Sequence, residues 1–234
     1  MEKQLKTDFD KVIKNLKPSK KNIELREKNL NEFIKKGFPN KRVEDWKFSD
    51  LNQIISSNIK ELKFFNDKTI PDEFDQSILI NSLDHNKIIL INGLIFKFDF
   101  NYEEKNKIEI INTHETEDFN SKNSLVSLNN ALKCNYVKLT IKENYSLNKP
   151  LIIYNITNKK LKSNTINQRI DFILKKNSSL KLVNLFDDSS NNNFININHQ
   201  FKIERDAILK NYKIDHKLNS NIKYFFNNIN LEHN

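Results

Sequence analysis

Glycine and cysteine are scarce in this chain, and each scarcity excludes a class of function. The 234 residues include two glycines, so a Gly-rich loop that cradles phosphates cannot form, and no ATPase activity of its own is expected. The single cysteine, Cys134, excludes an intrachain disulfide and is consistent with a reducing compartment. Cys134 ends an apolar helical pattern, which predicts a small buried hydrophobe.

Long apolar runs and a one-sided charge pattern are also missing. The longest apolar run covers residues 88–91, far short of a membrane span, and the N-terminus lacks the apolar stretch of a signal peptide. The net charge is +9, but bases alternate with acids, as in Lys35-Lys36 near Glu32, and no basic stripe carries aromatic platforms. These patterns predict a cytoplasmic protein that binds neither nucleic acid nor membrane.

The five histidines share no metal-ligand spacing, and Cys-x-x-Cys is absent. His199 lies on the apolar face of a predicted strand, so we expect a satisfied core histidine. His216 and His233 are predicted at the surface. No metal-binding residue is therefore predicted.

Two groups of acidic residues could be read as paired carboxylates. Asp187-Asp188 and the group Glu115, Glu117 and Asp118 stand among Asn, Ser and Thr, which is typical of solvated loops. No Ser/His/Asp set can be assembled either. The prediction is that the chain has no catalytic and no cofactor-binding residue.

The first part of the chain has helical periodicity. Apolar residues recur at helical spacing over residues 3–16, and Pro18 separates this helix from a second one at about 20–36. A third short helix is expected from the segment around Trp46 to about residue 57. Residues 123–133 also look helical, with Leu125, Leu128 and Leu132 in register.

Strand patterns begin in the middle of the chain. Asn92-Gly93, between apolar residues 88–91 and 94–98, predicts a hairpin with a type I′ turn. Beyond residue 135, apolar and polar residues alternate, and strands are expected to begin near 136, 150, 166, 179, 194, 207 and 222. No glycine follows Gly93, so turns must use Asn and Asp. Seven such strands suit a sandwich or a β-solenoid, and the pattern alone slightly favours the sandwich.

Residues 37–51 are the most specific segment, since they hold the only Trp with one Gly and one Pro. Gly37 fits a left-handed residue that ends a helix, and Pro39 prevents the helix from resuming. We expect Trp46 to be buried between the N-terminal helices and the first strands, with a loss of about 3–5 kcal/mol on Trp46→Ala.

In this order, Gly-x-Pro, Glu-x-Trp-Lys-aromatic and Leu resemble the SufD branch of the SufB/SufD iron–sulfur cluster assembly family. Three later segments, at residues 88–93, 128–131 and 137–153, follow the family's order. The match runs from about residue 25 to the end of the chain and is diffuse beyond residue 160. Phe48-Ser49 departs mildly from the family's usual Tyr-Thr. The residues that carry the resemblance are Gly37, Pro39, Glu44, Trp46, Lys47, Phe48, Leu51, Asn92, Gly93, Leu128, Asn129, Ala131 and Pro150.

The resemblance implies a mainly β fold with N-terminal helices (α+β), in which a right-handed parallel β-helix follows a small helical and mixed N-terminal domain. The expected parts are a helical region at 1–60, a mixed segment with the hairpin at 61–133, and a β-helix at 134–234. The β-helix looks incomplete at its C-terminal end. An incomplete solenoid leaves an open strand edge.

The resemblance also implies a function. The chain is expected to be a non-catalytic scaffold that works with SufB-like and SufC-like subunits, where the SufC-like subunit hydrolyses ATP. The family's late Cys-x-His segment is missing, and one thiolate cannot hold a cluster that takes four ligands. Any cluster is therefore handled transiently by the complex. The alternatives are a free-standing β-solenoid interaction module and, less favoured by its Asn-, Gln- and Lys-rich strands, a carbohydrate-active β-helix enzyme.

Overall fold

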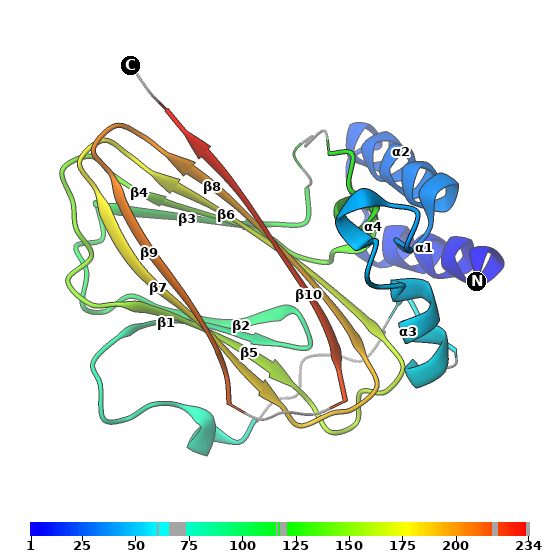
Figure 1. Cartoon of the computed structure of the whole chain (residues 1–234). Helices are drawn as coiled ribbons and strands as arrows, with labels where there is room; N and C mark the ends of the chain where they lie inside the picture. Colours follow the sequence, from blue (N-terminus) through cyan, green and yellow to red (C-terminus); the bar gives the residue numbers. More distant parts are fainter. Residues whose placement is uncertain (60, 66–73, 116, 118–120, 217–219, 233–234) are drawn as a thin grey trace.

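A helical region packs against a two-sheet β-solenoid of about three turns (Figure 1). The computed structural model describes residues 1–59, 61–65, 74–115, 117, 121–216 and 220–232. None of the helices in these ranges combines the length and the apolar character that crossing a membrane requires. The predicted fold class, α+β with a β-helix after N-terminal helices, is confirmed.

The two N-terminal helices are α1 (Glu2–Leu16) and α2 (Lys20–Lys36), as the periodicity predicts. Between them Lys17 adopts a left-handed conformation that ends α1, and the Ser19 hydroxyl accepts a hydrogen bond from the Asn22 amide to cap α2. Leu5, Phe9 and Val12 recur at helical spacing on α1 and are all buried. This apolar stripe holds α1 in the helical core.

The prediction that the third helix begins in the Trp46 segment is wrong, because the helix begins after that segment. The segment forms a 3₁₀ turn, η1 (Glu44–Trp46), and a separate helix, α3 (Leu51–Ile59), begins after it. The Leu51 amide donates to the Pro39 carbonyl over 3.0 Å, so this corner closes on itself before α3 starts. Gly37 ends α2 with a φ of 69° as expected, but its ψ of −167° is extended and not left-handed helical.

The predicted hairpin is present as β1 (Asn86–Ile91) and β2 (Leu94–Asp99), which pair antiparallel. Asn92 and Gly93 have φ values of 54° and 80°, which is what a type I′ turn requires. Between this hairpin and α2 the structure adds a second 3₁₀ turn, η2 (Gln76–Ile78).

Seven further strands alternate between two sheets, which decides against the sandwich. The sheet orders are β2-β1-β5-β7-β9 and β10-β8-β6-β4-β3, and every pair from β4 onward is parallel. Consecutive strands thus lie in opposite sheets, as in a solenoid. Each begins within one residue of its predicted start: β4 (Tyr136–Ile141), β5 (Leu151–Thr157), β6 (Thr165–Leu174), β7 (Ser179–Asp188), β8 (Phe194–Ile203), β9 (Ile208–Asp215) and β10 (Ile222–Leu231).

The first end of the solenoid is formed by antiparallel strands. β3 (Ile108–Thr113), which the sequence pattern did not predict, pairs antiparallel with β4, and β1 pairs parallel with β5. The middle segment therefore extends both sheets of the solenoid.

Asparagines at one corner hold successive turns in register. The Asn193 side-chain oxygen accepts a hydrogen bond from the backbone N–H of Asn164, 29 residues earlier, over 3.0 Å. The Asn221 side-chain oxygen accepts in the same way from the backbone N–H of Asn193, 28 residues earlier, over 2.9 Å. We call these three residues the Asn ladder. Nearby Ser163 and Asn192 have positive φ angles, so the corners turn without glycine.

Helix α4 (Ser124–Leu132) covers the outer face of the sheet at β6 and β8. All nine of its residues are buried. The Asn129 side chain donates to the backbone carbonyls of Gln168 and Asn196 over 2.9 and 2.8 Å. In return the Asn196 side chain donates to the Leu125 carbonyl. Asn196, on the polar face of β8, is therefore hydrogen-bonded by α4 instead of by water.

Candidate interaction site at the open end of the solenoid

Strands β9 and β10 form the last turn of the solenoid, and each ends its sheet. β9 pairs only with β7, and β10 only with β8, within the residues that the structure describes. In Figure 1 the two strands lie in opposite sheets, β9 (orange) next to β7 and β10 (red) next to β8. An edge strand presents a row of free N–H and C=O groups that can accept another strand.

The side chains of this last turn are exposed although they continue buried columns. In register, Phe201 of β8 is followed by Ile229 of β10, and Ile203 is followed by Leu231. The exposed fraction rises from 2% to 55% in the first column and from 9% to 52% in the second. β9 carries three more exposed apolar side chains, which lie on the face of its sheet turned away from the solenoid interior. We call the five exposed apolar residues of these two strands together the end patch: Ile208, Tyr212, Ile214, Ile229 and Leu231.

Ion pairs hold the last turn in place. Lys223 at the start of β10 lies 2.8 Å from the Asp188 carboxylate and 2.5 Å from that of Asp215. Burial lowers the pKa of Lys223, but the hydrogen bonds to Asp188 and Asp215 outweigh it and raise the pKa above its usual value. The lysine is therefore charged at neutral pH, and it joins β10 to β7 and β9.

Asp187 and Asp188 are not in a solvated loop, as the sequence had indicated. They end strand β7, and both are fully buried. His216, which is exposed as predicted, lies with Nδ1 3.1 Å from the Asp187 carboxylate. Both buried carboxylates therefore have a partner, His216 for Asp187 and Lys223 for Asp188.

Glu115 and Glu117 do lie in an exposed setting, and Asp118 is outside the described residues.

The family-motif residues do not converge on one site. Trp46 is half-buried, not buried, and its ring lies 5.9 Å from that of Tyr224 on β10. Phe48 is 87% exposed, whereas Leu51 is buried. The other motif residues stabilise the fold at separate places. Asn92 and Gly93 form the hairpin turn, Asn129 bonds α4 to the sheet, and the Pro150 carbonyl accepts a hydrogen bond from the backbone N–H of Asn86. The motif around residues 37–51 therefore places the helical region against the end of the solenoid.

Removing the Trp46 ring tests this corrected placement. Trp46→Ala should lower the free energy of unfolding by about 2 kcal/mol, because roughly half of a large aromatic surface loses its cover. Trp46→Phe keeps a ring against Tyr224 and should cost less than about 1 kcal/mol. Urea unfolding at equilibrium measures both. A loss of 4 kcal/mol or more for Trp46→Ala would restore the fully buried placement.

The histidines that the structure describes do not form a metal site. His85 is buried between the Leu83 carbonyl and the Tyr154 hydroxyl, which lie 2.6 and 2.7 Å from its ring nitrogens. His199 is in the core as predicted, but it is not satisfied, since neither ring nitrogen has a partner among the described residues. His233 lies outside them. The described part of the chain contains no group of three His, Cys, Asp or Glu residues that could hold a metal ion.

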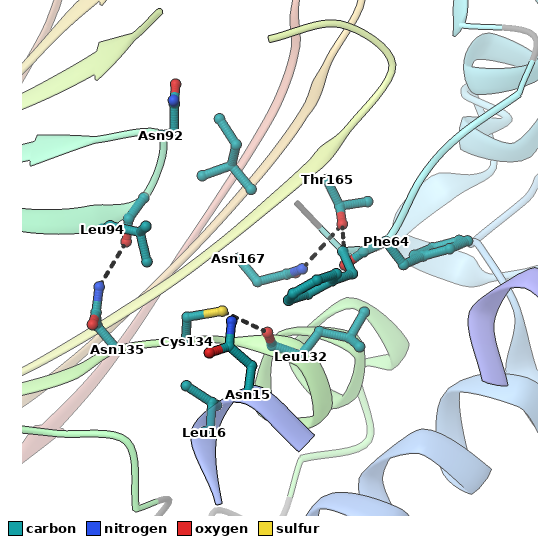
Figure 2. A pocket seen from close by; sticks show the side chains of 13 residues that line it. Asn15, Leu16, Phe64, Asn92, Leu94, Leu132, Cys134, Asn135, Thr165 and Asn167 are labelled. Atoms are coloured by element: carbon teal, nitrogen blue, oxygen red, sulfur yellow. Dashed lines mark hydrogen bonds between the residues drawn. The ribbon is translucent and has the colours of Figure 1, made fainter. Parts of the chain in front are cut away.

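A pocket of about 290 Å³ lies where the helical region meets the solenoid (Figure 2). Cys134 lines it and is half-buried, and its thiol lies 3.8 Å from the Leu132 carbonyl. Burial raises the pKa of this thiol above its usual value, so it is mostly protonated at neutral pH and a weak nucleophile. The other polar groups around it are amides and one hydroxyl: Asn15, Asn92, Asn135, Asn167 and Thr165.

Sequence reasoning missed a layer of buried charges under α4. Arg26 donates to the carbonyls of Ala131 and Lys133, 2.9 and 3.0 Å away, and so caps the end of α4. Lys133 is fully buried and donates to the Asn130 side chain over 3.0 Å. Burial, with Arg169 and Arg26 nearby, holds the pKa of Lys133 well below its usual value. Lys133 directly follows an apolar helix, and no spacing in the sequence marks it.

A search of protein-family models finds no match to this chain. A search of curated proteins finds no significant match either.

Proposed function

We propose that this chain is a SufD-like, non-catalytic scaffold of cytoplasmic iron–sulfur cluster assembly, which binds a partner protein through the open end of its solenoid. The order of the motifs around Trp46, Gly93, Asn129 and Pro150 supports the relationship. The β-helix that follows the N-terminal helices is the fold that this resemblance implies. The partners are SufB-like and SufC-like subunits, with ATP hydrolysis supplied by the latter.

The end patch on two unpaired edges is the observation that carries the proposal. A β-rich partner can add a strand to β10 or β9, and main-chain hydrogen bonds then give affinity. The alternation of side chains along β10 sets the register, because a slip of one residue moves Ile229 and Leu231 to the wrong face. Covering each of the five apolar side chains contributes about 1–2 kcal/mol.

In this function the cluster is cargo that belongs to the complex. The chain contributes a rigid surface: the Lys223 ion pairs order β10 before the partner arrives, so little ordering entropy is lost on binding.

Lysines on the end patch should abolish complex formation. We expect the double variant Ile229→Lys/Leu231→Lys to lose co-purification with coexpressed SufB-like and SufC-like subunits of the same genome. Charged side chains on an edge strand prevent strand addition. The matched control is Ile111→Lys, because Ile111 is also 43% exposed on an edge strand, β3, at the opposite end. Thermal melting should show all variants folded.

Binding that survives both lysines, or fails equally with Ile111→Lys, would contradict the proposed surface. Wild-type chain that binds neither subunit would overturn the SufD-like assignment. If it then captures another β-rich protein through the same patch, the free-standing interaction module is the correct function.

A further inference from the structure

The two sheets of the solenoid end in edge strands, two at each end. Strands β2 and β3 lie at the first end, and β9 and β10 at the last end, since each pairs with one neighbour within the described ranges. The free N–H and C=O groups of an edge strand can pair with a strand of another molecule. Which strand an edge accepts depends on the side chains that then stand opposite each other.

Most charges on these four edge strands are paired within the chain. The side chains that form ion pairs are Lys97, Asp99, Lys213, Asp215 and Lys223. Among the described residues, two charged side chains on the edge strands form none: Glu109 on β3 and Lys210 on β9. These two charges have opposite signs, and they lie at opposite ends of the solenoid.

Lys210 also lies beside a charge of its own sign. Its register partner on β7 is Lys181, and both side chains are exposed. Like charges directly opposite each other on a sheet are destabilising. A carboxylate next to Lys210, on the side of β9 that has no neighbouring strand, would offset this repulsion. Glu109 is exposed and lies opposite the uncharged Thr140, so it is available for this contact.

The apolar neighbours of these two residues match in the same register. When β3 runs antiparallel to β9 with Glu109 beside Lys210, the next two residues of β3 also meet apolar side chains. The resulting pairs are Ile110 with Leu209 and Ile111 with Ile208. The first pair extends the core, since both of its residues already pack, partly buried, against the same core cluster. The second pair covers side chains that are 43% and 56% exposed.

We propose that copies of this chain stack head to tail, with β3 of one copy pairing antiparallel with β9 of the next and Glu109 beside Lys210. The two surfaces differ, so the interface is heterologous, and its repetition without closure gives an open row of copies. This contact does not depend on the SufD-like assignment. A partner protein bound to β9 would end the row, so stacking and partner binding exclude each other at that strand.

The stacking is weak. The six residues of β3 bury far less than the roughly 800 Å² per partner of a stable complex. Main-chain hydrogen bonds supply most of the affinity, and the charges select the partner strand. We expect a dissociation constant of about 50 μM.

Sedimentation velocity of the full chain between about 5 and 500 μM, at low salt, tests the proposal. The average mass should rise with concentration beyond that of a dimer, because every added copy presents the same free strand. Lys210→Glu and Glu109→Lys should each raise the dissociation constant about tenfold, since like charges then face each other. An equimolar mixture of the two variants should associate again, because β3 and β9 of one variant meet opposite charges on the other.

Lys160→Glu is the matched control. It changes the net charge as Lys210→Glu does, and Lys160 is likewise exposed without an ion pair in the described part of the chain, but it lies at a corner between strands. It should leave the dissociation constant unchanged. A chain that is monomeric at every concentration overturns the proposal, and so does a mass that stops at a dimer. Association that survives both charge reversals, or that the mixture does not restore, would exclude the contact between Glu109 and Lys210.

Discussion

Replacing His199 with phenylalanine should stabilise the protein by about 1–2 kcal/mol at pH 7. The imidazole is fully buried, and its two unpartnered nitrogens each lose hydration without a hydrogen bond in return. Its neighbours are aromatic: the ring centroids of Phe172, Phe201 and Phe225 lie 5.3, 6.0 and 5.0 Å away. A phenyl ring suits this environment and removes the unpaired groups. Urea unfolding measures the gain.

The same substitution should change the acid stability. Burial lowers the pKa of His199 from 6.5 to about 3. Below pH 6.5 His199 therefore binds a proton in the unfolded chain but not in the folded chain. The folded state loses stability as the pH falls. Between pH 7 and pH 5 this loss amounts to about 2 kcal/mol in the wild type, at about 1.4 kcal/mol per pH unit. The variant should lack this component of the loss.

His85 provides the matched control, because it is buried with both ring nitrogens partnered. His85→Phe should destabilise the protein by about 1–3 kcal/mol, since the Tyr154 hydroxyl and the Leu83 carbonyl lose their partner. A His199→Phe variant that is less stable than the wild type at pH 7 would show that the imidazole makes a hydrogen bond in solution.

Gly93→Ala should lower the free energy of unfolding by about 2–4 kcal/mol. Gly93 has a φ of 80°, which costs an alanine about 1 kcal/mol or more. A Cβ there would also lie 2.6 Å from the Cγ2 atom of Ile166, and the branched side chain has little freedom to move away. The hairpin would be pushed from the solenoid.

Gly37→Ala separates strain from collision. Gly37 also has a positive φ, but a Cβ there meets no atom within 4 Å. Its loss should be limited to the backbone strain of about 1–3 kcal/mol. If Gly93→Ala loses no more than the strain of about 1 kcal/mol in parallel urea titrations, the contact with Ile166 contributes nothing and our explanation of Gly93 is wrong.

The elements with strong local signals were predictable from the sequence. Period-two alternation sets the strand starts, because one face of each strand must enter the core, and Asn92-Gly93 dictates its turn. The sheet arrangement was not predictable from alternation, since a sandwich and a solenoid bury the same residues. Only the family resemblance favoured the solenoid.

The candidate site was harder to predict because it depends on what is missing around a residue. Ile229 and Leu231 have the same pattern as Phe201 and Ile203, yet they are exposed because β10 pairs on one side alone within the described residues. Asp187-Asp188 looked like a loop because Asn and Ser surround it, whereas their partners, His216 for Asp187 and Lys223 for Asp188, come from far along the chain. Trp46 was placed too deep, since its contact, Tyr224, comes from the last strand.

The Asn ladder makes the solenoid modular. Asn164, Asn193 and Asn221 repeat every 28 or 29 residues, and the side chains of Asn193 and Asn221 each accept a hydrogen bond from the backbone of the preceding turn in the same way. A gene segment encoding one whole repeat can therefore be duplicated or lost while the remaining corners still match. A gain or loss of a few residues within a strand shifts every later contact. The solenoid can thus become longer or shorter during evolution by one whole turn at a time.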